Sequence, residues 1–251
     1  MIKTHKGAIK SMVYDPNCWM PGDGSFENWK LRREYEANPN AIEPKEPEKW
    51  LDYHVGVDIG QKHDYTALAV TECRPNYAGD KFYFVRYLHR FRLGLLFGTV
   101  VQKLVSLDRQ LRASGGSRSV SITWACDATG IGSPVVEMIQ KALPEATVVP
   151  VYITGGFSST VDYDESHISK QQLVSLIVAA FESGSVRIAE DVKEAESLIQ
   201  ELSNYELKRS ESGLVSYGAM TGGALDDLVT SLGLSLFSAV TWGSSSQVLF
   251  W

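Results

Sequence analysis

The sequence predicts a mixed α/β fold, in which one β-sheet of about five strands is flanked by helices. Two observations lead to this fold class. Three short β-rich runs separated by short turns occupy residues 53–88, which is typical of an antiparallel meander. After them, strand-like and helix-like patterns alternate to about residue 240. The composition agrees, because 251 residues with 44% hydrophobic and 22% charged side chains are enough for one large globular domain.

The meander is predicted from runs rich in β-branched and aromatic residues, at 53–60, 66–71 and 81–88. The next element is a helix over 98–113, because apolar residues recur there at roughly the helical period. This helix is followed by Ser114-Gly115-Gly116, a combination that is typical of a helix end.

The middle of the chain predicts a strand, a helix and a second strand. A run of strand-forming residues over 120–126 leads directly into Asp127. A helix is expected after Gly132, with Pro134 near its first turn, where the fixed φ of proline suits a helix start. Residues 147–153 are rich in β-branched side chains and predict a buried strand.

The last third of the chain is predicted to be mainly helical. Residues 155–169 are polar and rich in glycine and serine, which favours a surface loop, and a helix begins at Lys170. We then expect, in order, a short strand, a helix, a hairpin-like return and a final helix, at residues 185–189, 192–205, 213–219 and 224–240.

Residues 1–50 differ in composition from the remainder. They contain five of the nine prolines, which favours an extended arm or linker with one short helix near 26–37. Residues 51–242 are predicted to form the folded domain, and residues 243–251 a C-terminal tail.

Composition also excludes several classes of protein. The three cysteines are far apart and form no C-x-x-C pair, which argues against a disulfide framework or a zinc site and fits a reducing cytoplasm. No apolar run approaches the roughly 18 residues that span a bilayer, so we expect no membrane segment. A net charge of −6 disfavours a globally basic nucleic-acid binder, but not an enzyme that gathers carboxylates around metal ions. The phosphate-binding pattern G-x-x-x-x-G-K-[ST] does not occur, so the chain is not expected to be an ATP-driven motor.

Four aspartates stand at the ends of predicted elements. Asp58 ends the first strand, Asp127 follows the fourth, and Asp226 and Asp227 lie in the first turn of the final helix. If the two strands are neighbours in the sheet, their carboxylates lie close together and the helix can add a third ligand. Such a cluster is unfavourable without a cation, and oxygen ligands suit Mg²⁺ or Mn²⁺. Each aspartate alone also has an ordinary structural interpretation, as a turn or helix-capping residue.

Other polar residues are weaker candidates. Lys170, at the start of its helix, could reach a phosphate or the metal site, and His63 and Asp64 follow Asp58 closely enough to support that site. A basic run on and after the third predicted strand could contact phosphate, although a solvated strand face is the simpler interpretation; it comprises Arg86, His89, Arg90 and Arg92.

Six short motifs in residues 53–240 together resemble those of a known protein family. They are Val55-Gly56-Val57-Asp58-Ile59-Gly60, Asp64-Tyr65-Thr66-Ala67, Cys126-Asp127-Ala128-Thr129-Gly130-Ile131-Gly132, Lys170-Gln171-Gln172-Leu173, Glu201-Leu202 and Leu225-Asp226-Asp227-Leu228-Val229. In this order they resemble the nuclease domain of the large terminase subunit of tailed bacteriophages. The resemblance implies an RNase H-like fold and a metal-dependent endonuclease that cuts viral double-stranded DNA during genome packaging. It also implies two bound Mg²⁺ or Mn²⁺ ions.

The resemblance assigns metal ligands position by position. It implies that Asp58 is the first-strand ligand, Asp127 the second, and Asp226 and Asp227 the last pair. On a helical wheel Asp226 lies nearer the apolar face, which favours Asp226 turned toward the sheet. Many relatives carry a histidine directly before the aspartate pair, whereas Leu225 occupies this position here.

The resemblance also implies partners. These are double-stranded DNA, a terminase ATPase module, the small terminase subunit and the portal, in the cytoplasm of a bacterial host. The family's large subunit carries a packaging ATPase, so we expect this chain to be a separately encoded nuclease or a fragment, with residues 1–50 as its connecting or docking arm.

Three other functions compete with this interpretation. A Holliday-junction resolvase uses a similar site of four carboxylates. The segment Val57-Asp58-Ile59-Gly60 with Thr66 resembles the phosphate-binding hairpin of actin, heat-shock ATPases and sugar kinases, but the chain is too short for their two lobes. A binding module that has lost cleavage is disfavoured because all the acidic positions are present.

Overall fold

The computed structural model describes residues 13–14, 50–60, 64–75, 81–155, 159–189, 191–203, 205–209, 215–219 and 226–243. Most of the predicted N-terminal arm, including its short helix, lies outside these ranges, and so does the predicted tail after residue 243. Within the described ranges, no helix has the length and apolar character needed to cross a bilayer.

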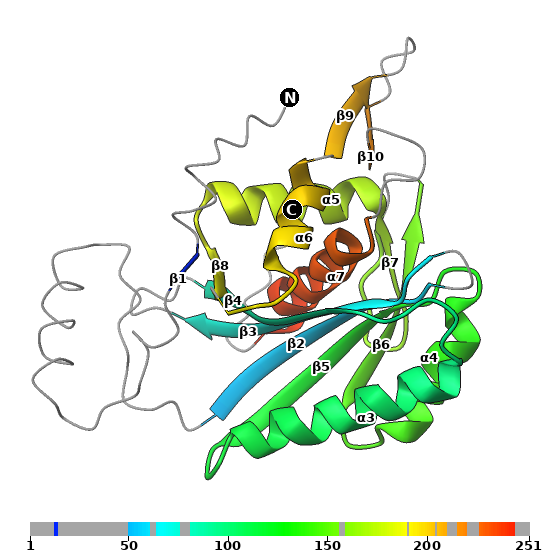
Figure 1. Cartoon of the computed structure of the whole chain (residues 1–251), viewed down its shortest axis with the longest axis vertical. Helices are drawn as coiled ribbons and strands as arrows, with labels where there is room; N and C mark the ends of the chain where they lie inside the picture. Colours follow the sequence, from blue (N-terminus) through cyan, green and yellow to red (C-terminus); the bar gives the residue numbers. More distant parts are fainter. Residues whose placement is uncertain are drawn as a thin grey trace, which may run out of the picture.

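Eight strands form one mixed sheet, in the order β1-β8-β4-β3-β2-β5-β6-β7 (Figure 1). Their bounds are β1 Val13–Tyr14, β2 Trp50–Asp58, β3 Ala67–Pro75, β4 Lys81–Arg90, β5 Ser119–Asp127, β6 Thr147–Thr154, β7 Ser166–Ser169 and β8 Val186–Ala189. Strands β2, β3 and β4 form the predicted antiparallel meander. On the other side of β2, strands β5, β6 and β7 continue the sheet in parallel. The predicted mixed sheet is confirmed, with more strands than the five or so expected.

One of the additional strands lies where a surface loop was predicted. β7 falls inside residues 155–169 and pairs with β6 at the edge of the sheet. Its four residues are Ser-His-Ile-Ser, which carry little of the β-branched or aromatic signal of a strand. The loop prediction was therefore wrong for these residues, because their pairing with β6 outweighs a weak local preference.

Helices cover both faces of the sheet, as predicted. Figure 1 shows α3 (Phe97–Ser114) and α4 (Gly132–Ala142) on one face, and α5 (Lys170–Glu182), α6 (Ala195–Ser203) and α7 (Asp227–Trp242) on the other. The predicted return is a separate antiparallel pair, formed by β9 (Tyr205–Arg209) and β10 (Val215–Ala219).

Helix α7 is the central helix of its layer. It packs on β2, β3 and β5 and is covered by α5 and α6 (Figure 1). A column of small polar residues faces the sheet, because Ser231, Ser235 and Ser238 are all fully buried. Gly56 of β2 lies opposite this column and lets the helix backbone rest against the strand. The contact connects β2, which ends at Asp58, with the helix that begins beside Asp226.

Buried hydrogen bonds reinforce the contact between α7 and the sheet. His54 of β2 is fully buried, and its Nδ1 lies 2.7 Å from Ser238 Oγ. The side-chain hydroxyl groups of Thr71 of β3 and Ser235 are hydrogen-bonded to each other. Since buried polar groups are unfavourable unless they are paired, these bonds favour one register of α7 on the sheet.

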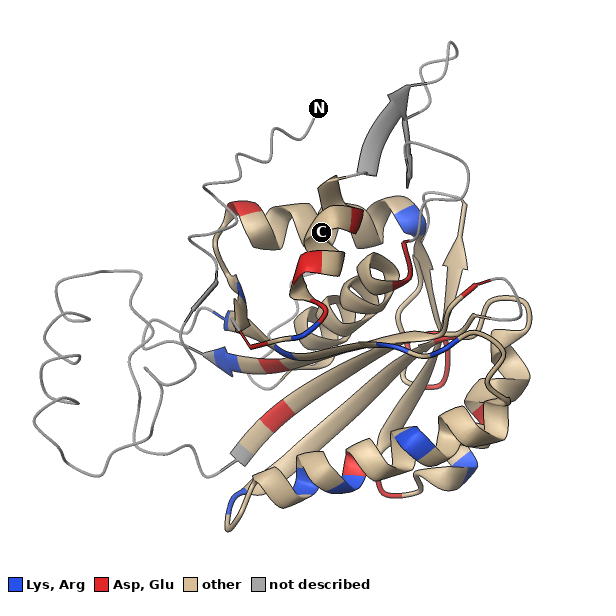
Figure 2. Cartoon of the chain, in the orientation of Figure 1, with Lys and Arg blue, Asp and Glu red and all other residues tan. Residues whose placement is uncertain are grey.

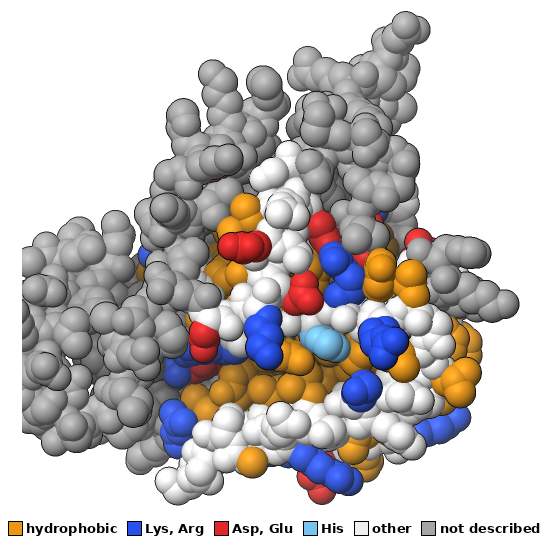
Figure 3. Space-filling model, in the orientation of Figure 1, with side chains coloured by type: hydrophobic (Ala, Val, Ile, Leu, Met, Phe, Trp, Pro, Cys, Tyr) orange, Lys and Arg blue, Asp and Glu red, His pale blue; other side chains and the backbone are white. Residues whose placement is uncertain are grey.

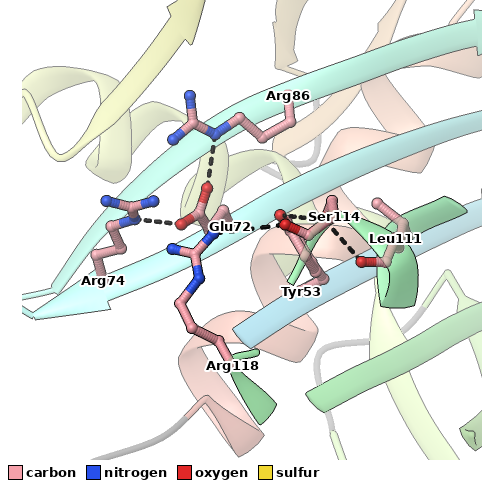
Figure 4. Close-up of polar contacts among 7 residues, drawn as sticks. All are labelled: Tyr53, Glu72, Arg74, Arg86, Leu111, Ser114 and Arg118. Atoms are coloured by element: carbon pink, nitrogen blue, oxygen red, sulfur yellow. Dashed lines mark hydrogen bonds and ion pairs between the residues drawn. The ribbon is translucent and has the colours of Figure 1, made fainter. Parts of the chain in front are cut away.

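A second polar cluster lies on the α3 side of the sheet, near the start of β2. Figure 4 shows the carboxylate of Glu72 between Arg74 and Arg86, with Arg86 Nε 2.7 Å from Glu72 Oε2. Nearby, Tyr53 Oη lies 3.2 Å from Ser114 Oγ, which connects β2 to the end of α3. Glu72 is only 2% exposed, and a buried negative charge is unfavourable unless it is paired. The two arginines provide this pairing.

Candidate active site

The structure places Asp58 and Asp127 side by side. Strands β2 and β5 are parallel neighbours, and Val57 pairs with Cys126, so each aspartate comes one residue after this pair. Adjacent strands lie about 4.8 Å apart, which leaves the two carboxylates within range of one cation. The expectation that these two strands are sheet neighbours is confirmed.

Local turns fix the chain after each strand. Oδ1 of Asp127 accepts a hydrogen bond from the backbone N–H of Thr129 at 2.8 Å, which closes an Asx turn. Thr129 Oγ1 in turn accepts from the N–H of Ile153 at 2.9 Å, which connects this turn to β6. After Asp58, the Gly60 N–H donates to Thr66 Oγ1 at 3.2 Å.

The final aspartate pair lies at the start of α7, and the two residues differ in burial. The side chain of Asp227 is 9% exposed, whereas that of Asp226 is 28% exposed. The helical-wheel prediction that Asp226 would be the inward-facing residue was wrong. Asp226 is the N-cap and has non-helical backbone angles, φ −139° and ψ 14°, so the wheel does not describe its direction.

Asp58 lies within the electrostatic influence of the other three aspartates. The pKa of Asp58 is raised well above its ordinary value, first by burial and then by the negative charges of Asp127, Asp227 and Asp226. The positive charge of Lys170 opposes this rise. Mutual repulsion of this kind is relieved when a cation binds among the carboxylates.

The pKa of Asp127 is raised as well. Burial is the main cause, and it is opposed by the hydrogen bonds from Thr129 and by the charge of Lys170. The raised pKa means that the protein destabilises the charged form of this carboxyl group when no cation is bound.

Asp227 also ionises less readily than a free aspartate. Its pKa is raised to about 6, mainly by burial, and the positive charge of Arg90 opposes the rise. The negative charges of Asp226 and Asp64 contribute to the rise, so Asp64, although exposed, acts on Asp227 electrostatically. His63 and Leu225, which sequence reasoning also considered, lie outside the described residues.

Lys170 is the cation of this group. Its Nζ lies 2.6 Å from Asp226 Oδ2, and its side chain is 42% exposed. Figure 2 shows the start of α5 coloured as basic and the chain at the start of α7 coloured as acidic. The N-terminus of helix α5 is stabilised, because Ser169 and Gln172 form a reciprocal capping box. Lys170 therefore lies beside Asp226, and its contact with a phosphate or the metal site stays a prediction.

Arg90 and Glu201 also belong to this region, although sequence reasoning assigned neither to it. Glu201 Oε2 accepts hydrogen bonds from the N–H groups of Leu228 at 3.0 Å and Val229 at 3.1 Å. Arg90 pairs with Glu201 and lies 3.5 Å from Asp227, measured from Nε to Oδ2. A signal for Glu201 was present in the sequence, because Glu201-Leu202 is one of the six motifs that carry the family resemblance.

The basic run on β4 does not form one phosphate-binding face. Arg86 pairs with Glu72 and Arg90 with Glu201, and His89 stacks on Tyr87 with 5.9 Å between ring centroids. Among these basic residues Arg92 is exposed. Figure 3 shows Lys and Arg side chains standing apart from one another around a hydrophobic band on this face of the molecule. These residues do not form a simple solvated strand face either, since Arg86 and Arg90 bind the buried carboxylates of Glu72 and Glu201.

The donor set suits a hard divalent cation. Its oxygens come from four aspartates, and Oδ2 of Asp227 is buried without a hydrogen-bond partner among the described residues. As they stand, no three His, Cys, Asp or Glu side chains in the described ranges are arranged to hold one ion together. Asp226 contacts Lys170 and Asp227 faces Arg90, so the final pair would have to turn toward the strand carboxylates to share an ion with them.

A comparison with protein families and a comparison with solved structures both found terminase domains. A family model described as a terminase RNaseH-like domain matches residues 55–232. The human cytomegalovirus terminase nuclease domain, soaked with Mn, has a TM-score of 0.50 and 13% identity, covering 88% of this chain and 97% of that one. The large terminase nuclease from the thermophilic phage G20c has a TM-score of 0.45 and 23% identity, covering 77% of this chain and 84% of that one. No curated protein matches the sequence.

Proposed function

The chain belongs to the terminase RNaseH-like domain family, and from this premise we propose that it is a metal-dependent endonuclease that cleaves viral double-stranded DNA during phage genome packaging. The observation that carries the proposal is the adjacency of Asp58 and Asp127 at the ends of two parallel neighbouring strands. The negative charges of Asp226 and Asp227, at the start of α7, raise the pKa of Asp58. Four carboxylates in one neighbourhood repel one another, and a bound cation relieves this repulsion.

The cofactor of this proposal is a pair of Mg²⁺ or Mn²⁺ ions. The ligands would be Asp58, Asp127 and the final pair, with the buried Asp227 more suitably placed than Asp226. Bound ions of this kind activate a water molecule and stabilise the leaving oxygen in phosphodiester hydrolysis. The Mn-soaked structure of the human cytomegalovirus domain supports the choice of metal class.

Two further side chains take supporting roles in the proposal. Lys170 would contact the DNA phosphate once its hydrogen bond to Asp226 opens, because 42% of its side chain is exposed. Asp64 would adjust the charge state of Asp227, whose pKa its negative charge raises. Phosphate contacts carry no sequence information, so we expect weak sequence selectivity in the isolated chain.

Packaging partners follow from the same family membership. We propose that residues 51–242 form the nuclease domain, that residues 1–50 connect it to a terminase ATPase module, and that residues 243–251 form a tail. The small terminase subunit and the portal would then select the cut site and deliver the DNA in the cytoplasm of the bacterial host. A Holliday-junction resolvase remains the alternative enzyme, because it requires the same kind of carboxylate site.

Cleavage of supercoiled plasmid tests the proposal. We expect the purified chain to nick and linearise plasmid with Mn²⁺ and to stop when EDTA is added. Asp58→Asn and Asp127→Asn should each lose at least about 100-fold in rate, because each removes a charged ligand. Asp164→Asn is the matched control, since Asp164 is exposed in the loop before β7. Full activity in either site variant would overturn the assignment, and preference for four-way junctions over linear duplex would favour the resolvase.

A further inference from the structure

Helix α7 starts without a cap from its own N-cap residue. An N-cap aspartate ordinarily accepts a hydrogen bond from an N–H group in the first helical turn. Asp226 occupies this position, but its side chain makes no such bond and instead accepts from Lys170 Nζ at 2.6 Å. The first N–H groups of α7 therefore depend on an acceptor from elsewhere in the fold.

Glu201 of α6 provides that acceptor. Its Oε2 accepts from the N–H groups of Leu228 and Val229, at 3.0 and 3.1 Å, and the residue is only 5% exposed. A carboxylate at a helix N-terminus also interacts favourably with the helix dipole. Leu228 and Val229 directly follow Asp227 in the chain, so these bonds fix the backbone immediately beside the buried aspartate.

Arg90 of β4 completes the arrangement. Its Nη2 donates to Oε1 of Glu201, so both oxygens of this carboxylate already have partners. Its Nε lies 3.5 Å from Asp227 Oδ2, near the carboxylate but too far for a good hydrogen bond. Arg90 and Glu201 together add no net charge, and they connect β4, α6 and the first turn of α7.

We propose that Glu201 and Arg90 are positioning residues that hold the start of α7 so that Asp227 can serve as the metal ligand of the final pair. The inference rests on the proposed nuclease function. Its physical basis is that an external carboxylate caps α7, while Oδ2 of the neighbouring Asp227 is buried and makes no hydrogen bond within the described residues. Arg90 holds Glu201 in place and lies beside the Asp227 carboxylate, so it connects the two acids.

Metal binding without DNA tests the proposal. Thermal unfolding is measured in EDTA and across a Mn²⁺ titration for the wild type, Glu201→Ala, Glu201→Gln, Arg90→Ala and the Arg90→Ala/Glu201→Ala double variant. The control is Glu196→Ala, which removes an exposed acid from the same helix. We expect the apparent Kd for Mn²⁺ to weaken by about 10- to 100-fold in Glu201→Ala, as is typical when a partner that orients a metal ligand is lost.

The other variants separate positioning from direct ligation and from simple folding support. Glu201→Gln keeps an oxygen that can accept from the α7 N–H groups, so we expect it to recover a substantial part of the Mn²⁺ affinity. The double variant should resemble Glu201→Ala alone, because both residues act through one contact. A Gln variant as weak as the Ala variant would overturn the proposal by making Glu201 a ligand itself.

Two results would separate the inference from the proposed function. If Glu201→Ala lowers the Tm in EDTA but leaves the Mn²⁺ affinity unchanged, Glu201 merely supports the fold and the inference is wrong, while the nuclease function stands. If the wild type gains no stability from Mn²⁺ and cleaves no DNA, the proposed function itself fails and takes the inference with it.

Discussion

Gly56 of β2 lies directly against the backbone of Ser231 in α7, where a Cβ atom on the glycine would stand 2.0 Å from the Ser231 carbonyl oxygen. The same Cβ would lie 2.5 Å from the backbone nitrogen of Ser235. Both distances are far below van der Waals contact, and neither backbone atom can rotate away. The helix that carries Asp227 is therefore seated on the strand that carries Asp58 at a position where only glycine fits.

We predict that Gly56→Ala destabilises the protein by about 3 kcal/mol or more, because α7 must move away from β2 and disrupt the packing beneath it. The Mn²⁺-induced rise in Tm should shrink as well, since α7 carries part of the proposed site. Thermal unfolding with and without Mn²⁺ measures both effects. Gly116→Ala is a useful comparison, because no atom lies within 4 Å of its added Cβ and only its φ of +60° is unfavourable. Equal losses in the two variants would show that the contact with Ser231 has no special importance.

A second prediction concerns Asp58, whose carboxylate is destabilised by burial and by three neighbouring aspartates. Asp58→Asn keeps the shape of the side chain and removes the charge, so in EDTA we expect the variant to be more stable than the wild type. A gain of about 1 kcal/mol would raise the Tm by roughly 2–4 °C in a domain of this size. The order should reverse in saturating Mn²⁺, where only the wild type gains stability from metal. A variant that is less stable in EDTA would mean that Asp58 is a structural residue.

Glu72 is a buried acid whose neighbours are positively charged, in contrast to those of Asp58. It is 2% exposed and paired with Arg74 and Arg86, so Glu72→Ala leaves two guanidinium groups without their shared partner. We expect a loss of about 3 kcal/mol in the free energy of unfolding, as is typical when a buried ion pair is broken. Glu72 pairs with Tyr53, five residues before Asp58, so it lies about 16 Å along the strand from the site. Mn²⁺ affinity and cleavage per folded molecule should therefore match the wild type, and a change in either would link the two clusters.

How far the sequence predicts this structure depends on the kind of signal. The meander and the strand that ends at Asp127 are marked by strong β patterns, and placing Asp58 beside Asp127 needed only the assumption that the two strands are neighbours. The four residues of β7 carry no such pattern, and their place in the sheet is determined by pairing with β6. Local sequence does not contain that information.

The start of α7 was harder to predict than the strands. A helical wheel assumes helical backbone at every position, but Asp226 is an N-cap and departs from it, so the buried residue is Asp227. The role of Glu201 could not be read from spacing alone, because its partners lie 27 and 28 residues further along the chain. The family motif included Glu201-Leu202, but the contact that explains it requires the folded arrangement of α6 and α7.

Lys170 gives the last prediction, because it is a cation that a metal ion would have to displace. Its Nζ lies 2.6 Å from Asp226 Oδ2, and its charge also favours the ionised forms of Asp58 and Asp127. Lys170→Met keeps a long apolar stem and removes the charge. The ion pair is part-exposed and contributes about 1 kcal/mol or less, so Mn²⁺ affinity should rise by roughly 3- to 5-fold. Cleavage should nevertheless fall, since the proposed phosphate contact is lost.

The two effects of Lys170→Met are measured separately, Mn²⁺ affinity by thermal shift without DNA and cleavage at saturating Mn²⁺. Lys141→Met is the matched control, because Lys141 pairs with Glu137 on the exposed side of α4, where both side chains are mostly exposed. Opposite changes in metal affinity and cleavage are expected only if the lysine competes with the metal for Asp226 and also binds the substrate. Weaker Mn²⁺ binding in the Met variant would instead mean that Lys170 helps to arrange the carboxylates, and the competition between lysine and metal would have to be abandoned.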